Sequence, residues 1–279
     1  MKSPFSIQTS DGLTLSGFSL VPPTKSKAVI ALIHGMGEHS MRYFHIAEFF
    51  ACQGVATMAL DLRGHGNSGG KRGHTPNYES LMEDIDLFLE KVKTEFPEIP
   101  IILYGHSMGG NLTLNYLIRR QPKISGAIVT SPYLRLAFEP PKWKVILGKL
   151  SAGLIPTLSQ PTGLETAAIS RDTAVVKAYE ADKLVHDKIT SAFFVNVHFA
   201  GPFAIENASK IKVPLLIMHG LEDRLTSPEG TKEFMQNAGK NVTAKFWPEL
   251  FHEIHNEPEQ KDVFETELNW LLNAKIIFN

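Results

Sequence analysis

The sequence predicts an α/β fold with a mostly parallel central sheet that is flanked by helices. Three observations support this prediction. Short, continuous apolar runs recur along the chain, segments with helical spacing separate them, and one long stretch interrupts the alternation. Continuous apolar runs are typical of parallel strands that helices cover on both faces, and regular alternation of strands with helices favours a parallel sheet.

The elements can be expected in the following order. A hairpin comes first, because two short alternating segments in residues 5–20 flank Asp11-Gly12. Apolar runs then predict the buried strands Ala28–Ile33, Val55–Leu60, Ile99–Tyr104, Ile124–Thr130 and Val213–Met218, and Val242–Trp247 is the last strand. Helical spacing predicts the helices Tyr43–Gln53, Tyr78–Glu95, Met108–Arg120, Glu229–Ala238 and Gln260–Leu272.

The alternation breaks between Tyr133 and Glu206. This stretch has few strand-like runs, several prolines, and helical spacing over Trp143–Ile155 and Asp172–Leu184. It is too long for a loop and too apolar for disorder. We therefore expect a core made of residues 1–132 and 207–279, with a helical cap of residues 133–206 inserted after the sixth strand.

Composition excludes several classes of protein. The 279 residues include 28 basic and 29 acidic side chains, which gives no electrostatic reason to expect nucleic acid as a partner. The single cysteine, Cys52, excludes an intramolecular disulfide and a cysteine-rich metal site. Its neighbours Phe49 and Phe50 predict a buried thiol. The N-terminus has no apolar segment of signal-peptide length, so we expect a cytoplasmic protein, peripheral at membranes.

The strongest catalytic signal is Gly105-His106-Ser107-Met108-Gly109, which fits G-x-S-x-G. It follows a predicted strand and precedes a predicted helix, and this context is the one that a nucleophile elbow requires. Glycines are needed because the turn is so tight that side chains there would collide. A serine that only caps the helix is the alternative, and the context favours Ser107 as the nucleophile.

A serine nucleophile needs a base that a carboxylate orients. Asp223 lies just past a predicted strand and is favoured over its neighbour Glu222. Either His252 or His255 could be the base, and His252 takes this role because it follows the last strand more closely, which leaves His255 a supporting or structural role. The zinc motif H-E-x-x-H would need a histidine where Asn256 stands, so no metal is predicted.

An oxyanion hole requires backbone N–H groups that point at the developing alkoxide. Met108, the residue after the nucleophile, should supply one donor, and Met36 in the loop after the early strand should supply the other. The G-x-G-x-x-G pattern of residues 64–69 lacks the helix that a dinucleotide site needs, so no cofactor is expected.

Five blocks of the chain carry a family resemblance: HGMGEHSMRY at 34–43, DLRGHGNSGG at 61–70, GHSMGG at 105–110, HGLED at 219–223 and FHEIHNE at 251–257. They are similar, in the same order, to blocks of the monoacylglycerol lipases and lysophospholipases of the α/β-hydrolase superfamily. The resemblance implies the α/β-hydrolase fold, Ser107 as nucleophile, Asp223 as acid and His252 as base, and oxyanion amides at Met36 and Met108. It also implies supporting positions in the site: His34, Gly35, Glu38, Arg42, His106 and His255.

The predicted cap matches the family in none of these blocks. Its segment from Trp143 to Ile155 mixes apolar residues with lysines, and it could line an acyl pocket, lie on a membrane or micelle surface, or pack on the core. We expect one face, with Leu147, Leu150 and Leu154, to line the pocket, and another to contact lipid. The expected substrate is the ester of a single-chain lipid such as a monoacylglycerol.

Other activities share these catalytic residues. A lysophospholipase or a short-chain esterase would use the same triad, and an aminopeptidase-like hydrolase would add a cap carboxylate for the substrate ammonium, with Glu165, Glu180 and Asp182 as candidates. A receptor of the same fold could keep the triad and bind a ligand without turnover. Enzymes of this fold with an aspartate nucleophile are disfavoured because a serine stands at position 107.

Overall fold

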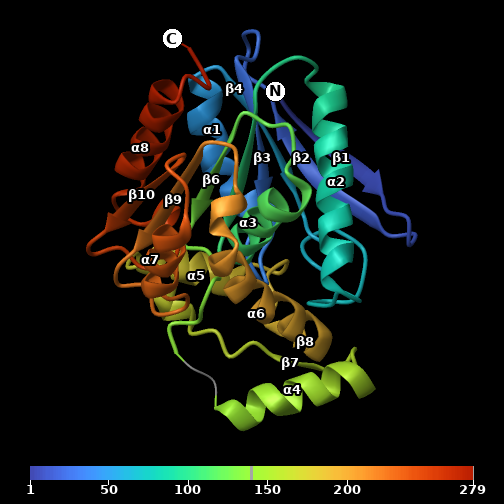
Figure 1. Cartoon of the computed structure of the whole chain (residues 1–279). Helices are drawn as coiled ribbons and strands as arrows, with labels where there is room; N and C mark the ends of the chain where they lie inside the picture. Colours follow the sequence, from blue (N-terminus) through green and yellow to red (C-terminus); the bar gives the residue numbers. More distant parts are fainter. Residues whose placement is uncertain (139–140, 279) are drawn as a thin grey trace.

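Within residues 1–138 and 141–278, which the computed structural model describes, eight strands form the main sheet in the order β1-β2-β4-β3-β5-β6-β9-β10 (Figure 1). The strands are β1 (Lys2–Gln8), β2 (Thr14–Leu20), β3 (Ala28–Ile33), β4 (Val55–Leu60), β5 (Ile101–His106), β6 (Gly126–Thr130), β9 (Leu215–Gly220) and β10 (Val242–Trp247). The β1–β2 and β2–β4 pairs are antiparallel, and the other pairs are parallel. The predicted hairpin and mostly parallel sheet are confirmed.

Helices connect the strands. They are α1 (Phe44–Cys52), α2 (Tyr78–Glu95), α3 (Met108–Arg120), α4 (Lys142–Leu154), α5 (Thr173–Ala181), α6 (Ser191–Glu206), α7 (Pro228–Asn237) and α8 (Gln260–Asn273), with 3-10 turns η1 (Ser40–Tyr43), η2 (Thr166–Ala168), η3 (Ala208–Lys210) and η4 (Ile254–Asn256). The start of α2 has a clear cause, because the Asn77 side chain accepts a hydrogen bond from the Ser80 amide at 2.8 Å. The bounds predicted for α2 and α3 are those observed.

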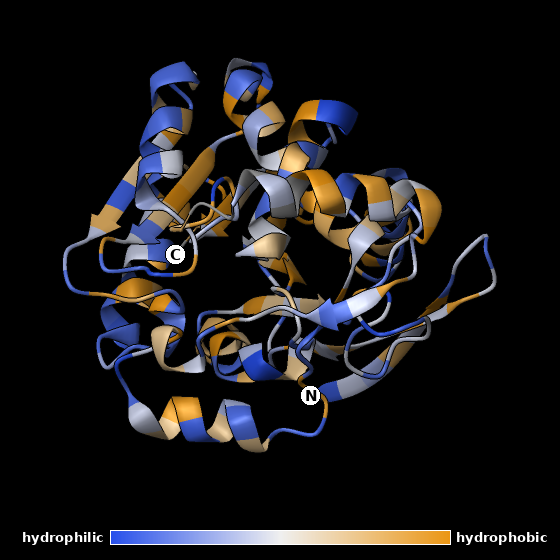
Figure 2. Ribbon diagram, turned by 90° about the horizontal axis from the view of Figure 1, so that it is seen from below, coloured by the Kyte–Doolittle hydropathy of each residue, from blue (hydrophilic) through white to orange (hydrophobic). Residues whose placement is uncertain are grey.

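The strand side chains alternate between two apolar layers. Val29, Ala31 and Ile33 of β3 pack with residues of α2, α3, α6 and α7 in one buried cluster. Ile30 and Leu32 of the same strand pack with residues of α1 and α8 in the other. In the view from below, the helices around the sheet carry both hydrophobic and hydrophilic residues (Figure 2). Because these strands are buried on both faces, their sequences are continuous apolar runs.

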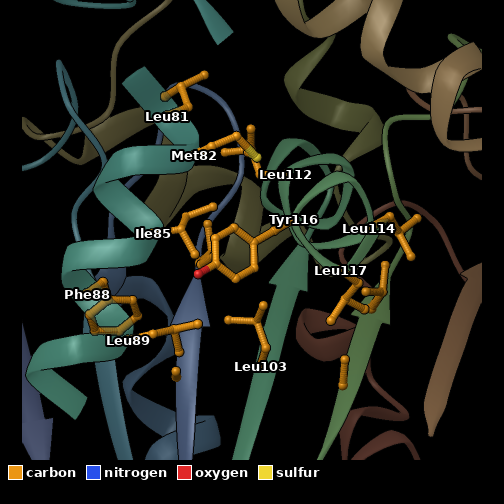
Figure 3. Packing of buried hydrophobic residues seen from close by; sticks show 14 of the residues in the cluster. Leu81, Met82, Ile85, Phe88, Leu89, Leu103, Leu112, Leu114, Tyr116 and Leu117 are labelled. Carbon is orange, nitrogen blue, oxygen red and sulfur yellow. The ribbon is translucent and has the colours of Figure 1, made fainter. Parts of the chain in front are cut away.

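Figure 3 shows the apolar layer between α2, α3 and the sheet from close by. Leu81 and Ile85 of α2 face Leu112 and Tyr116 of α3, with Leu103 of β5 beneath them. These five side chains are buried. The layer fixes the start of α3 relative to the end of β5, which is where the sequence predicts the nucleophile.

The chain between β6 and β9 leaves the sheet, as expected after the sixth strand. We call residues 133–206 the inserted segment. It contains α4, α5 and α6 and a small antiparallel pair of strands, β7 (Ser159–Pro161) with β8 (Lys188–Thr190). Figure 1 shows it below the main sheet, with α4 farthest from both chain termini. Polar contacts described below tie it to the loops that follow the parallel strands.

Three details of the sequence prediction need correction. The structure adds α6 and the β7–β8 pair, which the sequence did not predict as elements. Helix α5 ends at Ala181 rather than continuing to Leu184, because Asp182 is extended and its side chain accepts the Leu184 amide at 2.8 Å. Cys52 is exposed, because it ends α1 on the side away from the buried Phe50.

Replacing Leu103 by Ala should lower the free energy of unfolding by about 2–5 kcal/mol, because the fully buried side chain leaves a cavity between α2, α3 and the sheet. The matched control is Leu154→Ala, since Leu154 is 82% exposed on α4 and its loss should change stability by no more than about 0.5 kcal/mol. Urea denaturation measures both values. Equal effects in the two variants would contradict this account of the core.

Candidate active site

Ser107 stands at the turn between β5 and α3. Its backbone has a φ of +54°, a left-handed conformation that is uncommon for a residue with a side chain. The glycines on either side of it permit the turn: a Cβ at Gly105 would lie 2.3 Å from Thr113 Oγ1, and one at Gly109 would lie 2.2 Å from the Ile33 carbonyl oxygen. The strand–turn–helix geometry is the one that the G-x-S-x-G pattern predicts.

Asp223 and His252 meet at the ends of β9 and β10. His252 Nδ1 lies 2.7 Å from Asp223 Oδ2, and the two side chains are almost fully buried. The other carboxylate oxygen, Oδ1, accepts the backbone amides of Leu225 at 2.8 Å and Thr226 at 3.0 Å. Because parallel strands end at the same edge of the sheet, the pair lies on the side where Ser107 also stands.

Charge and burial act against each other in this pair. Burial disfavours the imidazolium of His252, but the charge and hydrogen bond of Asp223 outweigh it and raise the His252 pKa. Burial likewise opposes ionisation of Asp223, but the charge of His252 and hydrogen bonds from His219 and His252 lower the Asp223 pKa. The arrangement therefore holds a charged carboxylate against a histidine with increased basicity.

The two candidate histidines have different surroundings. His255 is fully buried, its ring is stacked 4.9 Å from the Tyr43 ring, and neither ring nitrogen has a hydrogen-bond partner. Burial lowers the His255 pKa well below its ordinary value. His106, whose Nδ1 lies 3.0 Å from Thr130 Oγ1, has its ring 4.7 Å from the His252 ring. Of the two candidates for the base, His252 is thus the one that the structure pairs with a carboxylate.

The loop after β3 helps to form the pocket that contains Ser107 and His252. His34 uses both ring nitrogens to hold this loop, with Nδ1 2.7 Å from the Gly35 carbonyl oxygen and Nε2 accepting the Leu62 amide at 2.9 Å. Gly35 and Met36 line the pocket together with Ser107. Met108 follows Ser107 as the first residue of α3. Both residues predicted to supply oxyanion amides therefore lie close to Ser107, one in the pocket wall and the other next to it in the sequence.

A buried ionic network supports this loop. The Arg42 guanidinium binds both oxygens of Glu253 at 2.7 Å and also Glu38. Glu38 Oε1 accepts the Gly35 amide and the Tyr43 hydroxyl, each at 2.6 Å. Burial alone would raise the Glu253 pKa, but Arg42 lowers it to about 2. Glu253 was not predicted as a site residue, and its position directly after His252 is the signal that could have identified it.

The pocket around Ser107 and His252 is small, with a volume of about 30 Å³. The inserted segment contributes three side chains to its wall: Leu164, Ile169 and Tyr179. Sequence reasoning did not find these residues. The predicted Leu147, Leu150 and Leu154 lie on α4 instead, with 54%, 59% and 82% of their surface exposed and outside the residues that line this pocket.

The cap carboxylates considered for an aminopeptidase have other partners. Asp182 Oδ2 lies 2.8 Å from His39 Nε2, Glu180 accepts the Thr166 hydroxyl at 2.6 Å, and Glu165 lies 3.7 Å from the Arg224 guanidinium. None of the three carboxylates is among the residues that line the described pocket. In the part of the chain that the structure describes, no group of three or more His, Cys, Asp or Glu could hold a metal ion.

The sheet, the elbow at Ser107 and the helices inserted after β6 define an α/β-hydrolase. A model of the family described as serine aminopeptidase, S33, matches residues 24–259, and the chain belongs to this family.

A monoacylglycerol lipase of Mycolicibacterium smegmatis is 35% identical over 90% of this chain and 90% of its own length. An uncharacterized abhydrolase domain-containing protein of Dictyostelium discoideum is 37% identical over 94% of this chain, which spans only 28% of that protein. The crystal structure of Paleococcus ferrophilus monoacylglycerol lipase superposes with a TM-score of 0.85, at 33% identity over 92% of this chain and 99% of that one. These similarities indicate a carboxylic ester hydrolase.

Replacing Arg42 by Met should lower the free energy of unfolding by about 3–5 kcal/mol at pH 7, because two buried carboxylates lose their cation. In the native protein Arg42 lowers the Glu253 pKa from 4.5 to about 2, so this stabilisation is complete above pH 4.5 and is lost as the pH falls toward 2. The difference in free energy of unfolding between the native protein and Arg42→Met should therefore become smaller as the pH is lowered.

Urea denaturation of the native protein and of Arg42→Met at pH 7 and pH 3 measures this difference in stability. The control is Arg135→Met, which breaks an exposed pair with Glu233 and should cost no more than about 1 kcal/mol at either pH. A cost of Arg42→Met that does not change between the two pH values would contradict the assignment of the network.

Proposed function

We propose that this protein hydrolyses the ester of a single-chain lipid, a monoacylglycerol, through a Ser107–His252–Asp223 triad and an acyl-enzyme. The observation that carries the proposal is the 2.7 Å contact of His252 Nδ1 with Asp223, because it leaves Nε2 as the nitrogen available to the pocket that His252 shares with Ser107. A base oriented in this way is what a serine nucleophile requires.

The first half of the reaction forms the acyl-enzyme. His252 Nε2 accepts the Ser107 hydroxyl proton as Oγ attacks the ester carbonyl carbon, and Asp223 stabilises the imidazolium that results. The amides of Met36 and Met108 donate hydrogen bonds to the tetrahedral oxyanion. When the intermediate collapses, His252 returns the proton to the leaving alcohol, and the acyl group stays on Ser107.

The second half releases the fatty acid. His252 Nε2 accepts a proton from a water molecule, whose oxygen attacks the acyl carbon, and the same two amides again stabilise the oxyanion. Collapse of this intermediate breaks the bond to Ser107 Oγ, which takes the proton back from His252. The products are a free fatty acid and the restored serine, and the chain's own groups supply every proton transfer.

The wall of the pocket supports a substrate with an apolar part and a polar part. Met36, Leu164 and Ile169 supply apolar surface, and Glu38 and Glu253 supply polar surface. Both carboxylates already bind Arg42, and Glu38 also accepts the Gly35 amide and the Tyr43 hydroxyl, so a substrate ammonium would have to compete with partners within the protein. This observation favours a neutral ester over a peptide with a free amino terminus.

We further propose that residues 133–206 form a cap over the catalytic residues. Ile169 and Tyr179 reach the pocket from this segment, and Gly37 accepts a hydrogen bond from the His186 amide at 2.8 Å. The described pocket is small, with a volume of about 30 Å³, and we propose that the cap moves when a long acyl chain binds.

The exposed face of α4 supports transient contact with a membrane or micelle. Ile146, Leu147, Leu150 and Leu154 are each more than half exposed on this helix, and Lys149 lies among them. Apolar residues beside a cation are typical of helices that lie in a lipid interface. No helix among the described residues is long and apolar enough to span a bilayer. The cytoplasmic location stays a prediction.

Replacing Ser107 by Ala should lower kcat for monoacylglycerols and p-nitrophenyl esters by about 10⁴- to 10⁶-fold, because the nucleophile is lost, while circular dichroism shows a folded protein. Turnover by this variant at the native rate would contradict the triad. Native protein labelled by a fluorophosphonate but without turnover of any ester would instead support a receptor. Comparable kcat/KM on short and long acyl chains would contradict a lipid substrate.

Replacing Leu147 and Leu150 together by Ser should reduce hydrolysis of long-chain micellar monoacylglycerols about tenfold, because less apolar surface can enter the lipid. Hydrolysis of a soluble short-chain ester should stay unchanged. The control is Phe278→Ser, which removes an exposed aromatic ring near the C-terminus, far from α4. Native rates of the double variant on micelles would rule out this role of α4.

A further inference from the structure

His219, a second histidine that contacts Asp223, has no place in the reaction described above. It lies in β9, four residues before Asp223, and its side chain is fully buried. Its Nε2 is 3.0 Å from Asp223 Oδ2 and 3.2 Å from the Thr226 carbonyl oxygen. Its Nδ1 is 2.8 Å from Thr231 Oγ1 in α7.

The surroundings of the ring determine where its proton lies. A carboxylate and a carbonyl oxygen can only accept hydrogen bonds, so Nε2 must carry a hydrogen and donate. In the neutral ring Nδ1 is then an acceptor, and the Thr231 hydroxyl donates to it. The hydrogen bond from Thr231 therefore favours the tautomer in which His219 Nε2 donates to Asp223. Hydrogen bonds to the second ring nitrogen commonly set the tautomer of a histidine in this way.

Asp223 Oδ2 is shared between two histidines. It lies 2.7 Å from His252 Nδ1, 3.0 Å from His219 Nε2 and 2.8 Å from Thr226 Oγ1. The Asp223 carboxylate has no solvent-exposed surface, so these three donors take the place of water as its hydrogen-bond partners. The Leu225 and Thr226 amides hold the other oxygen, Oδ1, so the loss of the His219 donor would leave Oδ2 less well solvated and less firmly directed at His252.

We propose that His219 is a positioning residue of the triad, which holds Asp223 in the orientation that directs Oδ2 at His252 Nδ1. This inference rests on the proposed Ser107–His252–Asp223 mechanism. His219 touches neither the substrate nor the reacting serine, and it acts only through Asp223. Hydrogen bonding from His219 also contributes to the lowered pKa of Asp223, which agrees with this role.

Two substitutions separate positioning from packing. Leu fills a volume similar to that of His but offers no donor, so His219→Leu keeps the bulk and removes the hydrogen bond. Gln can place its amide nitrogen near the position of Nε2, so His219→Gln keeps a donor to Oδ2. The difference between these variants measures the hydrogen bond, and a role in packing alone would affect them similarly.

The experiment compares kcat, KM and the pH dependence of kcat/KM on a soluble ester, with rates divided by active sites counted by fluorophosphonate labelling. For His219→Leu we expect kcat to fall by about 10- to 100-fold with KM within about threefold. The acid limb should move to lower pH, because a misdirected Asp223 no longer raises the His252 pKa. His219→Gln should recover most of kcat and the native limb.

The acid limb of the kcat/KM profile reports on the Asp223–His252 contact, because the other titratable groups near His252 are unchanged in these variants. These groups are Glu38, Glu253, His106 and His255. If His219→Leu does not fold, Thr231→Val is the replacement, because it frees the His219 ring and should shift the limb in the same direction by a smaller amount.

A kcat within about twofold of native and an unmoved acid limb in His219→Leu would overturn the inference, as would equal losses in the Leu and Gln variants. For Thr231→Val, an unmoved limb would overturn it. Ser107→Ala and Asp223→Asn, assayed in parallel, separate the role of His219 from the triad mechanism as a whole. If both are inactive while His219→Leu is native-like, only the role of His219 fails, whereas an active Ser107→Ala refutes the mechanism itself.

Discussion

The contact between Asp223 Oδ2 and His252 Nδ1 is the interaction on which the rest of the site depends. It joins the loop after β9 to the loop after β10, so it requires these strands to be parallel neighbours, as their pairing shows. It also requires a carboxylate that stays charged without water. The amides of Leu225 and Thr226 meet this second requirement, because they donate to the oxygen that His252 does not use.

Arg42 makes a second link of the same kind, between the loop after β3 and the loop after β10. One guanidinium lies between Glu38 and Glu253, and a buried group with two carboxylates and one cation is stable only if hydrogen bonds satisfy the remaining oxygens. The Gly35 amide and the Tyr43 hydroxyl do so for Glu38. The ionic network thus stabilises the loop of the proposed oxyanion hole, and the Arg42 guanidinium is bound to protein carboxylates.

The sequence predicts this molecule well where the signal is local. Ala28–Ile33 and Val55–Leu60 have their predicted bounds, because strands buried on both faces are apolar throughout. Helix α6 was missed because its sequence is apolar on most sides and contains Pro202, so it has no amphipathic period. The turn at Ser107 was predicted correctly because its signal, the G-x-S-x-G pattern between a strand and a helix, is also local. Glu253 was missed because its only local signal is its place next to His252, and its partner Arg42 is 211 positions away.

The inserted segment is anchored to the catalytic loops as well as to the rest of the core. The Glu253 amide, next to His252, donates to the Ile169 carbonyl oxygen at 2.7 Å, and the His186 amide donates to the Gly37 carbonyl oxygen at 2.8 Å. Any motion that breaks these bonds also releases the loops beside Ser107. Helix α4 packs mainly on α6, at the far side of the segment. A displacement of α4 alone would break neither of these two bonds, so the proposed movement of the cap can leave the anchored part and the alignment of His252 in place.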